Sequence, residues 1–500
     1  MRQKTIVTAA LAMIATSALL ACGGDKLQVT SGTIIQNATI VNTRDGSLLA
    51  GMSVIIDNGK ITNITGSPLE VSGSAQVVDG SGKYVVPGYN DMHSHAMGYA
   101  NQAPTLWPLL IANGVTGIRE MAGTPDLIKA ARQLNLDSAA GKADAPEILM
   151  TTGPILVGIN SPAAAIKAVQ ESKAMGADFV KLFQASKEST VTVFEEAKRQ
   201  GLTVAGHLPG AAVSATELSK YGMRALEHYG AGYGAALDCA SDENAIRQAL
   251  ASGQGAPTPY NPAIATYRVG DAPFYQRIID TYSESKCVAL AQTFVQNETW
   301  MVPTLIRLHT IADSGAALYR NDPNLQYVDQ GRRTVWAAYG KASNSDIPVA
   351  AQTSFLKFFP LQQKMTKLFK QQGVKMMTGS EVTATLIIPG FSLQQEFQEL
   401  AAAGLTPLEV LQMTTLNPAQ FLQREAAMGT VDTGKNADLV LLDANPVLDT
   451  ANLSKIAGVF LKGRFIPKSA LEKLKADVAG AYAQKPTAAQ AAFVDPSHSH

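Results

Sequence analysis

The chain has no excess charge of either sign and is poor in cysteine and histidine. Lys plus Arg and Asp plus Glu number 41 each, so the formal net charge is zero. No long-range field therefore favours a polyanion. No basic run with interleaved aromatic residues is present either, and we expect no nucleic-acid partner. With 3 Cys and 7 His in 500 residues, each of these side chains can be considered individually.

What is abundant is apolar residues and turn formers. Apolar residues make up 46% of the chain and charged residues 16%, with 41 Gly and 24 Pro. This composition is typical of a globular protein with a large core and many turns. The length allows two or three ordinary domains, or one large barrel with additions.

The N-terminus has the features of an export signal. Arg2 and Lys4 precede an apolar run over 6–20, which is too short to span a membrane comfortably. Leu-Leu-Ala then precedes Cys22, which resembles the lipobox of bacterial lipoproteins. The resemblance predicts that 1–22 is a signal peptide with lipidation at Cys22, and that the protein acts at the periplasmic side of the membrane or at the cell surface. Membrane contact would then occur only through this lipid anchor. The alternative is an ordinary secretory signal with an incidental cysteine.

The other two cysteines, Cys239 and Cys287, form a candidate pair. An exported protein meets an oxidising compartment, which favours a disulfide. This bond would close a loop of nearly fifty residues and stabilise the fold by ~3–4 kcal/mol in the loop-entropy model. Two buried thiols are the alternative.

Both ends of the chain consist of short β-type segments. Residues 27–84 contain alternating β-branched runs, and Asn58-Gly59 is a strong hairpin signal. Residues 427–466 have the same texture, so the two pieces predict one small β-sandwich assembled from both chain ends. Residues 467–500 predict a C-terminal helix followed by a polar tail.

The middle of the chain, 85–426, alternates strand-like and helical segments and predicts an α/β fold, a (β/α)8 TIM barrel. Its eight expected strands lie within 85–95, 114–119, 147–151, 178–183, 202–207, 225–228, 301–306 and 374–379. Two connections, 230–299 and 307–373, are too long for plain crossovers. Because barrel active sites lie at the C-terminal ends of the strands, we expect these connections to form helical lids and substrate walls.

Four of the seven histidines lie at or near the ends of expected strands. His93 and His95 are two residues apart, so their side chains lie on one side of a strand, and His207 and His228 end two further strands. Four imidazoles suit zinc, or less specifically manganese, cobalt or iron. Polar residues where strands run into loops are the alternative. For His309, after the seventh strand, a satisfied loop histidine is the expected role.

Lys181 ends the fourth expected strand, inside the same ring of residues. A free ammonium would repel a divalent cation, whereas a lysine that has captured CO2 as a carbamate would be an anionic bridge between two metals. The alternative is a lysine that extends outward or pairs with a carboxylate.

Several motifs in the same order resemble the amidohydrolase superfamily of metal-dependent hydrolases, in its imidazolonepropionase-like and prolidase-like branch. The resemblance covers residues 30–466. The motifs are Pro87-Gly88 with Asp91-x-His93-x-His95, Phe179-Val180-Lys181-Leu182, 204–209, Leu226-Glu227-His228, 403–411, 414–419 and 428–443.

The resemblance implies a centre of two divalent ions, with Zn2+ as the expected metal. His93 and His95 would hold one ion, His207 and His228 the other, and carbamylated Lys181 would bridge them. A metal-bridging hydroxide would attack the substrate carbonyl.

The final ligand of the family, which also moves the proton, is an aspartate. Here Glu381 stands at that position, and its extra methylene displaces the carboxylate by ~1.5 Å. Glu381 either does the same ligand and general acid–base work or misses the metal.

The expected reaction is cleavage of an amide (C–N) bond in a dipeptide, N-acyl amino acid or related small amide. Tyr229 and Arg307 are candidate contacts for a substrate carboxylate. The alternatives are a lactam or ester hydrolase on the same site, or a catalytically impaired metal-binding lipoprotein. The sequence leaves open whether the protein forms a homo-oligomer.

Overall fold

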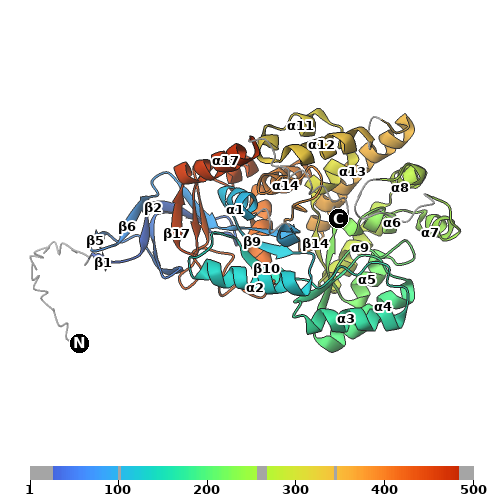
Figure 1. The fold of residues 1–500 in the computed structure, drawn as a ribbon, viewed down its shortest axis with the longest axis horizontal. Coiled ribbons are helices and arrows are strands. Elements are labelled where there is room, and N and C mark those ends of the chain that lie inside the picture. Colours follow the sequence, from blue (N-terminus) through green and yellow to red (C-terminus); the bar gives the residue numbers. More distant parts are fainter. Residues whose placement is uncertain (1–25, 99–102, 256–266, 343–345, 484–500) are drawn as a thin grey trace, which may run out of the picture.

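The computed structural model describes residues 26–98, 103–255, 267–342 and 346–483. The predicted signal peptide with Cys22, and the tail beyond 483, lie outside these residues. A sheet built from both chain ends lies at one end of the molecule, and the larger α/β body lies beside it (Figure 1). Among the described residues, no helix has the length and apolar character needed to cross a membrane.

The end sheet joins strands that are far apart in the sequence. It has eight strands in the order β17-β16-β15-β7-β2-β3-β4, with β6 paired to β2, and β1 and β5 form a separate parallel ribbon. The central junction is the antiparallel pairing of β15 with β7, where Val440 lies opposite Val86. The strands are β1 Leu27–Val29, β2 Thr33–Val41, β3 Leu48–Asp57, β4 Lys60–Thr65, β5 Leu69–Val71, β6 Gln76–Asp79, β7 Tyr84–Pro87, β15 Leu439–Leu442, β16 Ile456–Leu461 and β17 Arg464–Pro467.

Local sequence explains the hairpin in this sheet. Asn58 and Gly59 connect β3 to β4 and both have positive φ, at +49° and +74°, as a type I′ turn requires. The β-branched residues Ile35, Val54 and Val85 are buried in one apolar core together with Leu439, which comes from the other chain end. Pairing of the two ends is therefore stabilised by apolar burial. The division into domains stays a prediction.

The α/β body contains parallel strands in two sheets, β10-β9-β8 and β11-β12-β13-β14. Single parallel bridges, Thr152 to Phe179 and Met301 to Met376, extend these sheets at their edges. The strands are β8 Tyr89–Ser94, β9 Val115–Glu120, β10 Glu147–Thr151, β11 Phe179–Leu182, β12 Thr203–Gly206, β13 Met223–Glu227 and β14 Trp300–Val302. The arrangement is of the barrel type, but the described sheets do not close into one continuous ladder.

Three expected strands differ from the structure. The segment 85–95 is two strands, because Val85–Pro87 pairs in the end sheet and the chain crosses to β8 at Gly88. The seventh strand stops at Val302 because Pro303 has no N–H for a ladder. The segment 374–379 forms an isolated bridge at Met376 instead of a strand.

Helices cover the parallel strands and form both long connections. Pro at the first turn and Ser or Thr N-caps begin α2, α3 and α15, as helix-start chemistry predicts. The helices are α1 Ala103–Ala112, α2 Pro125–Ala139, α3 Pro162–Ala174, α4 Lys187–Gln200, α5 Ala215–Tyr221, α6 Gly234–Asp238, α7 Glu243–Ala251, α8 Ala272–Asp280, α9 Glu284–Gln296, α10 Leu305–Ala312, α11 Ala317–Arg320, α12 Gln330–Gly340, α13 Val349–Gln371, α14 Phe391–Ala402, α15 Pro407–Thr414, α16 Leu416–Phe421 and α17 Lys468–Ala483. Short 3-10 turns are η2 His228–Gly230, η4 Val269–Asp271, η5 Pro323–Tyr327 and η7 Thr450–Ser454.

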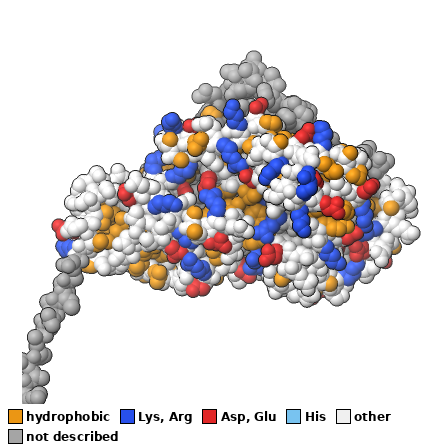
Figure 2. All heavy atoms as spheres, turned by 90° about the horizontal axis from the view of Figure 1, so that it is seen from below, with side chains coloured by type: hydrophobic (Ala, Val, Ile, Leu, Met, Phe, Trp, Pro, Cys, Tyr) orange, Lys and Arg blue, Asp and Glu red, His pale blue; other side chains and the backbone are white. Residues whose placement is uncertain are grey.

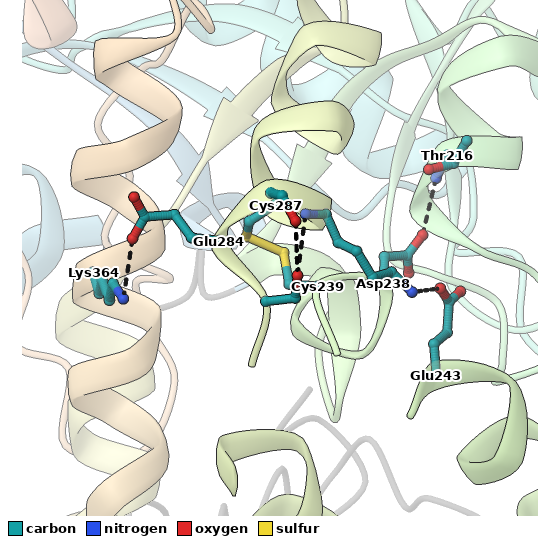
Figure 3. The surroundings of a disulfide bond; sticks show 10 residues. Thr216, Asp238, Cys239, Glu243, Glu284, Cys287 and Lys364 are labelled. Atoms are coloured by element: carbon teal, nitrogen blue, oxygen red, sulfur yellow. Dashed lines mark hydrogen bonds and ion pairs between the residues drawn. A yellow bond between two sulfur atoms is a disulfide. The ribbon is translucent and has the colours of Figure 1, made fainter. Parts of the chain in front are cut away.

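The first long connection is crosslinked. Cys239, which follows α6, is bonded to Cys287 in α9, with 4.6 Å between the two Cα atoms (Figure 3). The predicted disulfide is therefore confirmed. An ion pair of 3.3 Å between Glu284 and Lys364 links α9 onward to α13. The two connections are thus joined to each other as well as to the body.

Charges of both signs share the surface. On the face shown in Figure 2, Lys and Arg side chains are interspersed with those of Asp and Glu, as the equal numbers of the two classes suggest. The predicted C-terminal helix, α17, lies against α1, where Tyr482 Oη and Thr105 Oγ1 are 2.7 Å apart.

Candidate active site

The predicted site residues converge at one end of the parallel strands. His93 lies in β8 and Lys181 in β11, while His207 and His228 directly follow β12 and β13. A cavity of about 760 Å³ opens beside them. Its wall includes the predicted residues His95, Lys181, His207, His228, Arg307 and Glu381.

Glu381 lies among three imidazoles. Its Oε2 is 2.9 Å from His93 Nε2 and 2.7 Å from His228 Nε2, and its Oε1 is 3.7 Å from His95 Nε2. One ligand atom each from His93, His228 and Glu381 lies within 4.8 Å of the other two. Nitrogen and carboxylate donors in this arrangement fit a divalent ion such as zinc.

His207 supplies an independent indication of a missing partner. Its side chain is 7% exposed, and within the described part of the chain neither ring nitrogen has a hydrogen-bond partner. Its ring centre is 5.2 Å from that of His228. Buried polar atoms without partners are costly, and a metal ion would satisfy this imidazole. Burial, followed by the nearby Lys181, holds the pKa of His207 well below its usual value, which favours the neutral ring that a metal requires.

Lys181 does not extend outward. Its side chain is 2% exposed and its Nζ is 3.0 Å from His93 Nε2. Burial lowers the pKa of the Lys181 amine, although Glu381 and Glu227 oppose the shift. The structure therefore places a lysine with an increased tendency to be neutral inside the group of imidazoles.

An unusual backbone conformation aims Glu381. Its φ is +64°, a left-handed value that is uncommon for a residue with a side chain. The backbone N–H of Glu381 donates to His93 O at 2.9 Å, and the preceding Ser380 N–H donates to Asp91 Oδ1 at 3.0 Å. These contacts bring the longer glutamate side chain within reach of the histidines. Burial alone would raise its pKa, but His228 and His93 lower the pKa well below the usual value.

Two functional residues were missed by sequence reasoning. His93 Nδ1 is 2.7 Å from Glu227 Oε2, so the ring donates its proton there and turns Nε2 toward Glu381. Arg119 Nη2 donates to Glu227 Oε1 at 2.7 Å. Burial favours a higher pKa for Glu227, but Arg119 and His93 lower it to about 2. A carboxylate behind a metal-binding histidine sets its orientation and tautomer. The signal was the charged residue within the buried run before His228.

Of the two predicted substrate contacts, Arg307 lines the cavity and Tyr229 does not. Tyr229 does not line the cavity: it is 1% exposed, its hydroxyl bonds Thr366 Oγ1, and its ring packs on Phe369. The prediction for Tyr229 is corrected because its left-handed backbone, with φ at +57°, turns the side chain toward α13. Arg307 does line the cavity, from the first turn of α10.

Arg307 is the arginine of this wall that has no ion-pair partner among the described residues. Its Nη1 makes long contacts of 3.4 Å to Thr310 Oγ1 and 3.3 Å to Thr385 O. Among the described residues it forms no ion pair with a carboxylate, whereas Arg247 and Arg268 in the same wall do. His309 also lies in α10, not in a loop, and its Nδ1 is 2.6 Å from Glu399 Oε1, as expected for a satisfied histidine.

Comparison with known proteins agrees with this geometry. A model of the amidohydrolase family matches residues 360–466, which include Glu381. The imidazolonepropionase of Streptococcus gordonii is 46% identical over 44 residues, 9% of this chain and 14% of that protein. The chain spans 14% to 28% of the length of the three curated relatives that it matches.

Solved structures share the fold over most of the chain. A bottromycin amidohydrolase has a TM-score of 0.65 and 18% identity, with 93% of each chain covered. A Xaa-Pro dipeptidase with methionine bound in its active site has a TM-score of 0.59 and 18% identity, covering 87% of this chain and all of that one. These likenesses imply a (β/α)8 barrel with an added β domain. Together with the family model over 360–466 and the short matches to curated relatives, they support the resemblance of this chain to the amidohydrolase superfamily.

Proposed function

We propose that the protein hydrolyses the amide (C–N) bond of a dipeptide, N-acyl amino acid or related small amide at a centre of two divalent metal ions. The observation that carries this proposal is the position of Glu381 among three imidazoles at a cavity. Zinc is the first metal to test, because nitrogen and carboxylate donors suit it.

The residues divide between two ions. His93 and His95 would hold one, His207 and His228 the other, with Lys181 and Glu381 between them. When bound, such ions activate water and polarise a carbonyl oxygen. The unpartnered nitrogens of His207 support this assignment, because that ring has no other polar function among the described residues.

Lys181 would contribute as a carbamate. The neutral amine attacks the carbon of CO2, an N–C bond forms, one proton leaves, and the product carries a negative charge. Burial, which lowers the pKa of the amine, increases the neutral fraction that can react. The carbamate would replace a cation by an anion at a place where cations bind.

Glu381 would move the proton. Its carboxylate accepts a proton from the attacking water and donates it to the leaving nitrogen, so that a neutral amine departs. A lowered pKa in the resting protein keeps this group ionised, which is the form that can accept a proton.

Arg307 supports a substrate with a carboxylate. It is 4% exposed and has no carboxylate partner among the described residues, so an anionic ligand would compensate its charge in a partly dehydrated wall. The cavity of about 760 Å³ lies in the usual range for small-molecule sites. Dipeptides and N-acyl amino acids provide both the amide and the carboxylate.

The test is a hydrolysis assay on metal-analysed protein. We expect about two metal ions per chain, turnover that increases with bicarbonate, and preference for N-acyl amino acids over the same compounds with an amidated carboxylate. Arg307→Gln should raise KM for the former compounds and leave KM for the latter unchanged, with Arg307→Lys intermediate. Preference for lactams or esters would overturn the substrate assignment, and bound metal without any turnover would identify a binding protein.

We also propose that 1–22 directs export and that Cys22 carries the lipid anchor. In a bacterial host, the wild-type protein should remain with membranes and incorporate a labelled fatty acid. Cys22→Ser should abolish the label. Equal labelling of the two proteins, or no label in the wild type, would contradict the proposed anchor.

A further inference from the structure

The second nitrogen of His228 is held by a residue from a different element. His228 Nδ1 forms a short hydrogen bond with Thr304 Oγ1. The hydroxyl of Thr304 itself donates to Pro303 O at 2.8 Å. With that proton on Pro303 O, the hydroxyl oxygen is placed to accept a proton from Nδ1, and this is the arrangement that we infer. This tautomer leaves the Nε2 lone pair of His228 facing Glu381 Oε2, 2.7 Å away.

Thr304 adopts a conformation that a β-branched residue avoids. Its φ and ψ are +44° and +53°, which is costly for a side chain branched at Cβ. Thr304 also occupies the N-cap position of α10 without capping the helix through its side chain. Its hydroxyl is hydrogen-bonded to His228 instead. The first N–H groups of α10 therefore need another acceptor.

Glu396 of α14 supplies that acceptor. Its Oε2 accepts from Ile306 N–H at 2.8 Å. Glu396 is fully buried, so the contact is not exchanged with solvent. The start of α10, and with it Thr304, is therefore fixed from the packed core.

We propose that Thr304 is a positioning residue, held through α10 by Glu396, that sets the tautomer and direction of His228. The inference rests on the proposed function in so far as His228 is taken as a metal ligand. Residues that hold the far nitrogen of such a histidine typically change metal affinity by about 10- to 100-fold. Thr304 thus contacts Nδ1 of His228 in the same way that Glu227 contacts Nδ1 of His93.

The variants separate the hydroxyl from the shape of the side chain. Thr304→Ser keeps the acceptor, and Thr304→Val removes it at nearly constant volume. Glu396→Gln keeps one acceptor oxygen for the helix, whereas Glu396→Leu removes both. Thr366→Val is the matched control, because Thr366 is a buried threonine whose hydroxyl bonds Tyr229, away from the cavity.

The first measurement is made without metal and in a Glu381→Ala background, in which the protein with unaltered Thr304 serves as the wild type. Glu381 is removed because its ionised carboxylate, 2.7 Å from His228 Nε2, would otherwise hold a proton on that nitrogen. In protein labelled with 15N-histidine, the His228 signal is assigned by its loss in His228→Gln. We expect the Nδ1–H tautomer in the wild type, Thr304→Ser and Thr366→Val, and its loss in Thr304→Val and Glu396→Leu. Nε2–H in the wild type, or an unchanged tautomer in Thr304→Val, would overturn the inference.

The second measurement is zinc competition against a chelator. One zinc ion should bind about 10- to 100-fold more weakly to Thr304→Val than to the wild type, while Thr304→Ser and Thr366→Val bind normally. Equal affinities in Thr304→Val and the wild type would overturn the inference even if zinc binds. A wild type that binds no zinc but shows the expected tautomers would overturn the proposed function and leave the role of Thr304 intact.

Discussion

The Glu381 carboxylate meets His93 and His228 at 2.9 and 2.7 Å, although one methylene longer than the aspartate expected there. The backbone of Glu381 has a positive φ, and with this backbone the longer side chain brings the carboxylate to the two imidazoles. The contact with the imidazoles therefore depends on both the side-chain length and the backbone conformation. An aspartate with the same backbone should place its carboxylate farther from His93 and His228.

Substitutions at Glu381 test this match. We expect Glu381→Gln and Glu381→Ala to lower kcat by about 10²- to 10⁴-fold, the usual range for loss of a general acid–base group. Glu381→Asp should retain part of the activity, because its carboxylate retreats by ~1.5 Å. Amide hydrolysis and zinc content are measured together. Full activity in both Glu381→Asp and Glu381→Ala would show that Glu381 is not the catalytic residue.

Glu227 matters for stability as well as for orientation. It bonds both His93 and Arg119, and both carboxylate partners are buried. Glu227→Gln leaves the Arg119 charge buried and unpaired, so we expect a loss of ~3–5 kcal/mol in the free energy of unfolding. Urea denaturation of metal-free protein measures it. The double variant Arg119→Met/Glu227→Gln should recover part of the loss, and no recovery would contradict the explanation.

At the scale of elements, the crossing from β7 to β8 requires a residue without a side chain. A Cβ at Gly88 would lie 2.1 Å from Thr116 Oγ1 and 2.6 Å from its Cγ2. The backbone of this crossing and Thr116 of β9 approach each other too closely there for any larger residue.

Gly88→Ala should therefore destabilise the protein by ~1–3 kcal/mol, the usual cost of overpacking. Gly480→Ala in α17 is the control, since a Cβ there meets nothing within 4 Å and alanine favours a helix. Thermal unfolding should show a lower Tm for the first variant and an equal or higher Tm for the second. Equal Tm values for Gly88→Ala and the wild type would contradict the proposed close approach.

The end sheet also contains a carboxyl group that should make stability depend on pH. Burial raises the pKa of Asp438 from 3.8 to about 6, and Lys462 N–H donates to its Oδ1 at 2.8 Å. The folded protein holds this proton more tightly than the unfolded chain. The contribution is therefore fully present below about pH 4 and lost as pH rises through about 6.

Asp438→Asn removes this titration and keeps an oxygen for Lys462 N–H. Relative to the variant, the wild type should lose up to ~3 kcal/mol in the free energy of unfolding between pH 4 and pH 7. Urea denaturation at several pH values measures both proteins. Parallel pH profiles would show that Asp438 does not titrate in this way.

At the scale of the whole molecule, the two long connections contribute part of the cavity wall, and the ion pair between Glu284 and Lys364 joins them to each other. The disulfide holds α6 to α9, and α6 begins six residues after His228. Arg307 enters the wall from α10, at the start of the second connection. Residues of these connections thus face the cavity together with the histidines at the strand ends.

Removal of the disulfide should lower global stability without removing the site. Cys239→Ala/Cys287→Ala should lose ~3–4 kcal/mol in the loop-entropy model, while zinc affinity at low temperature stays unchanged. Denaturant unfolding and zinc competition measure the two quantities. A loss of zinc affinity together with unchanged stability would reverse this assignment.

Local sequence determined the hairpin at Asn58-Gly59, the disulfide pair, the mixture of strands and helices, and the group of His93, His207, His228 and Lys181. The hairpin, the elements and the histidine group follow from turn chemistry, periodicity and the alternation of side chains along strands, which are local properties. The disulfide was expected from the cysteine count and the export signal. Arg307 was also identified from its place after a strand end.

Only the tertiary structure decided the contacts between distant elements. Glu227 behind His93, Thr304 behind His228, and Tyr229 turned toward α13 all depend on side-chain directions set by packing. Left-handed φ values at Thr304 and Glu381 depend on neighbours such as Glu396, and no local preference predicts them. The sequence alone therefore indicated the histidines, Lys181 and Glu381, whereas long-range packing decided which further residues join them and how each side chain is aimed.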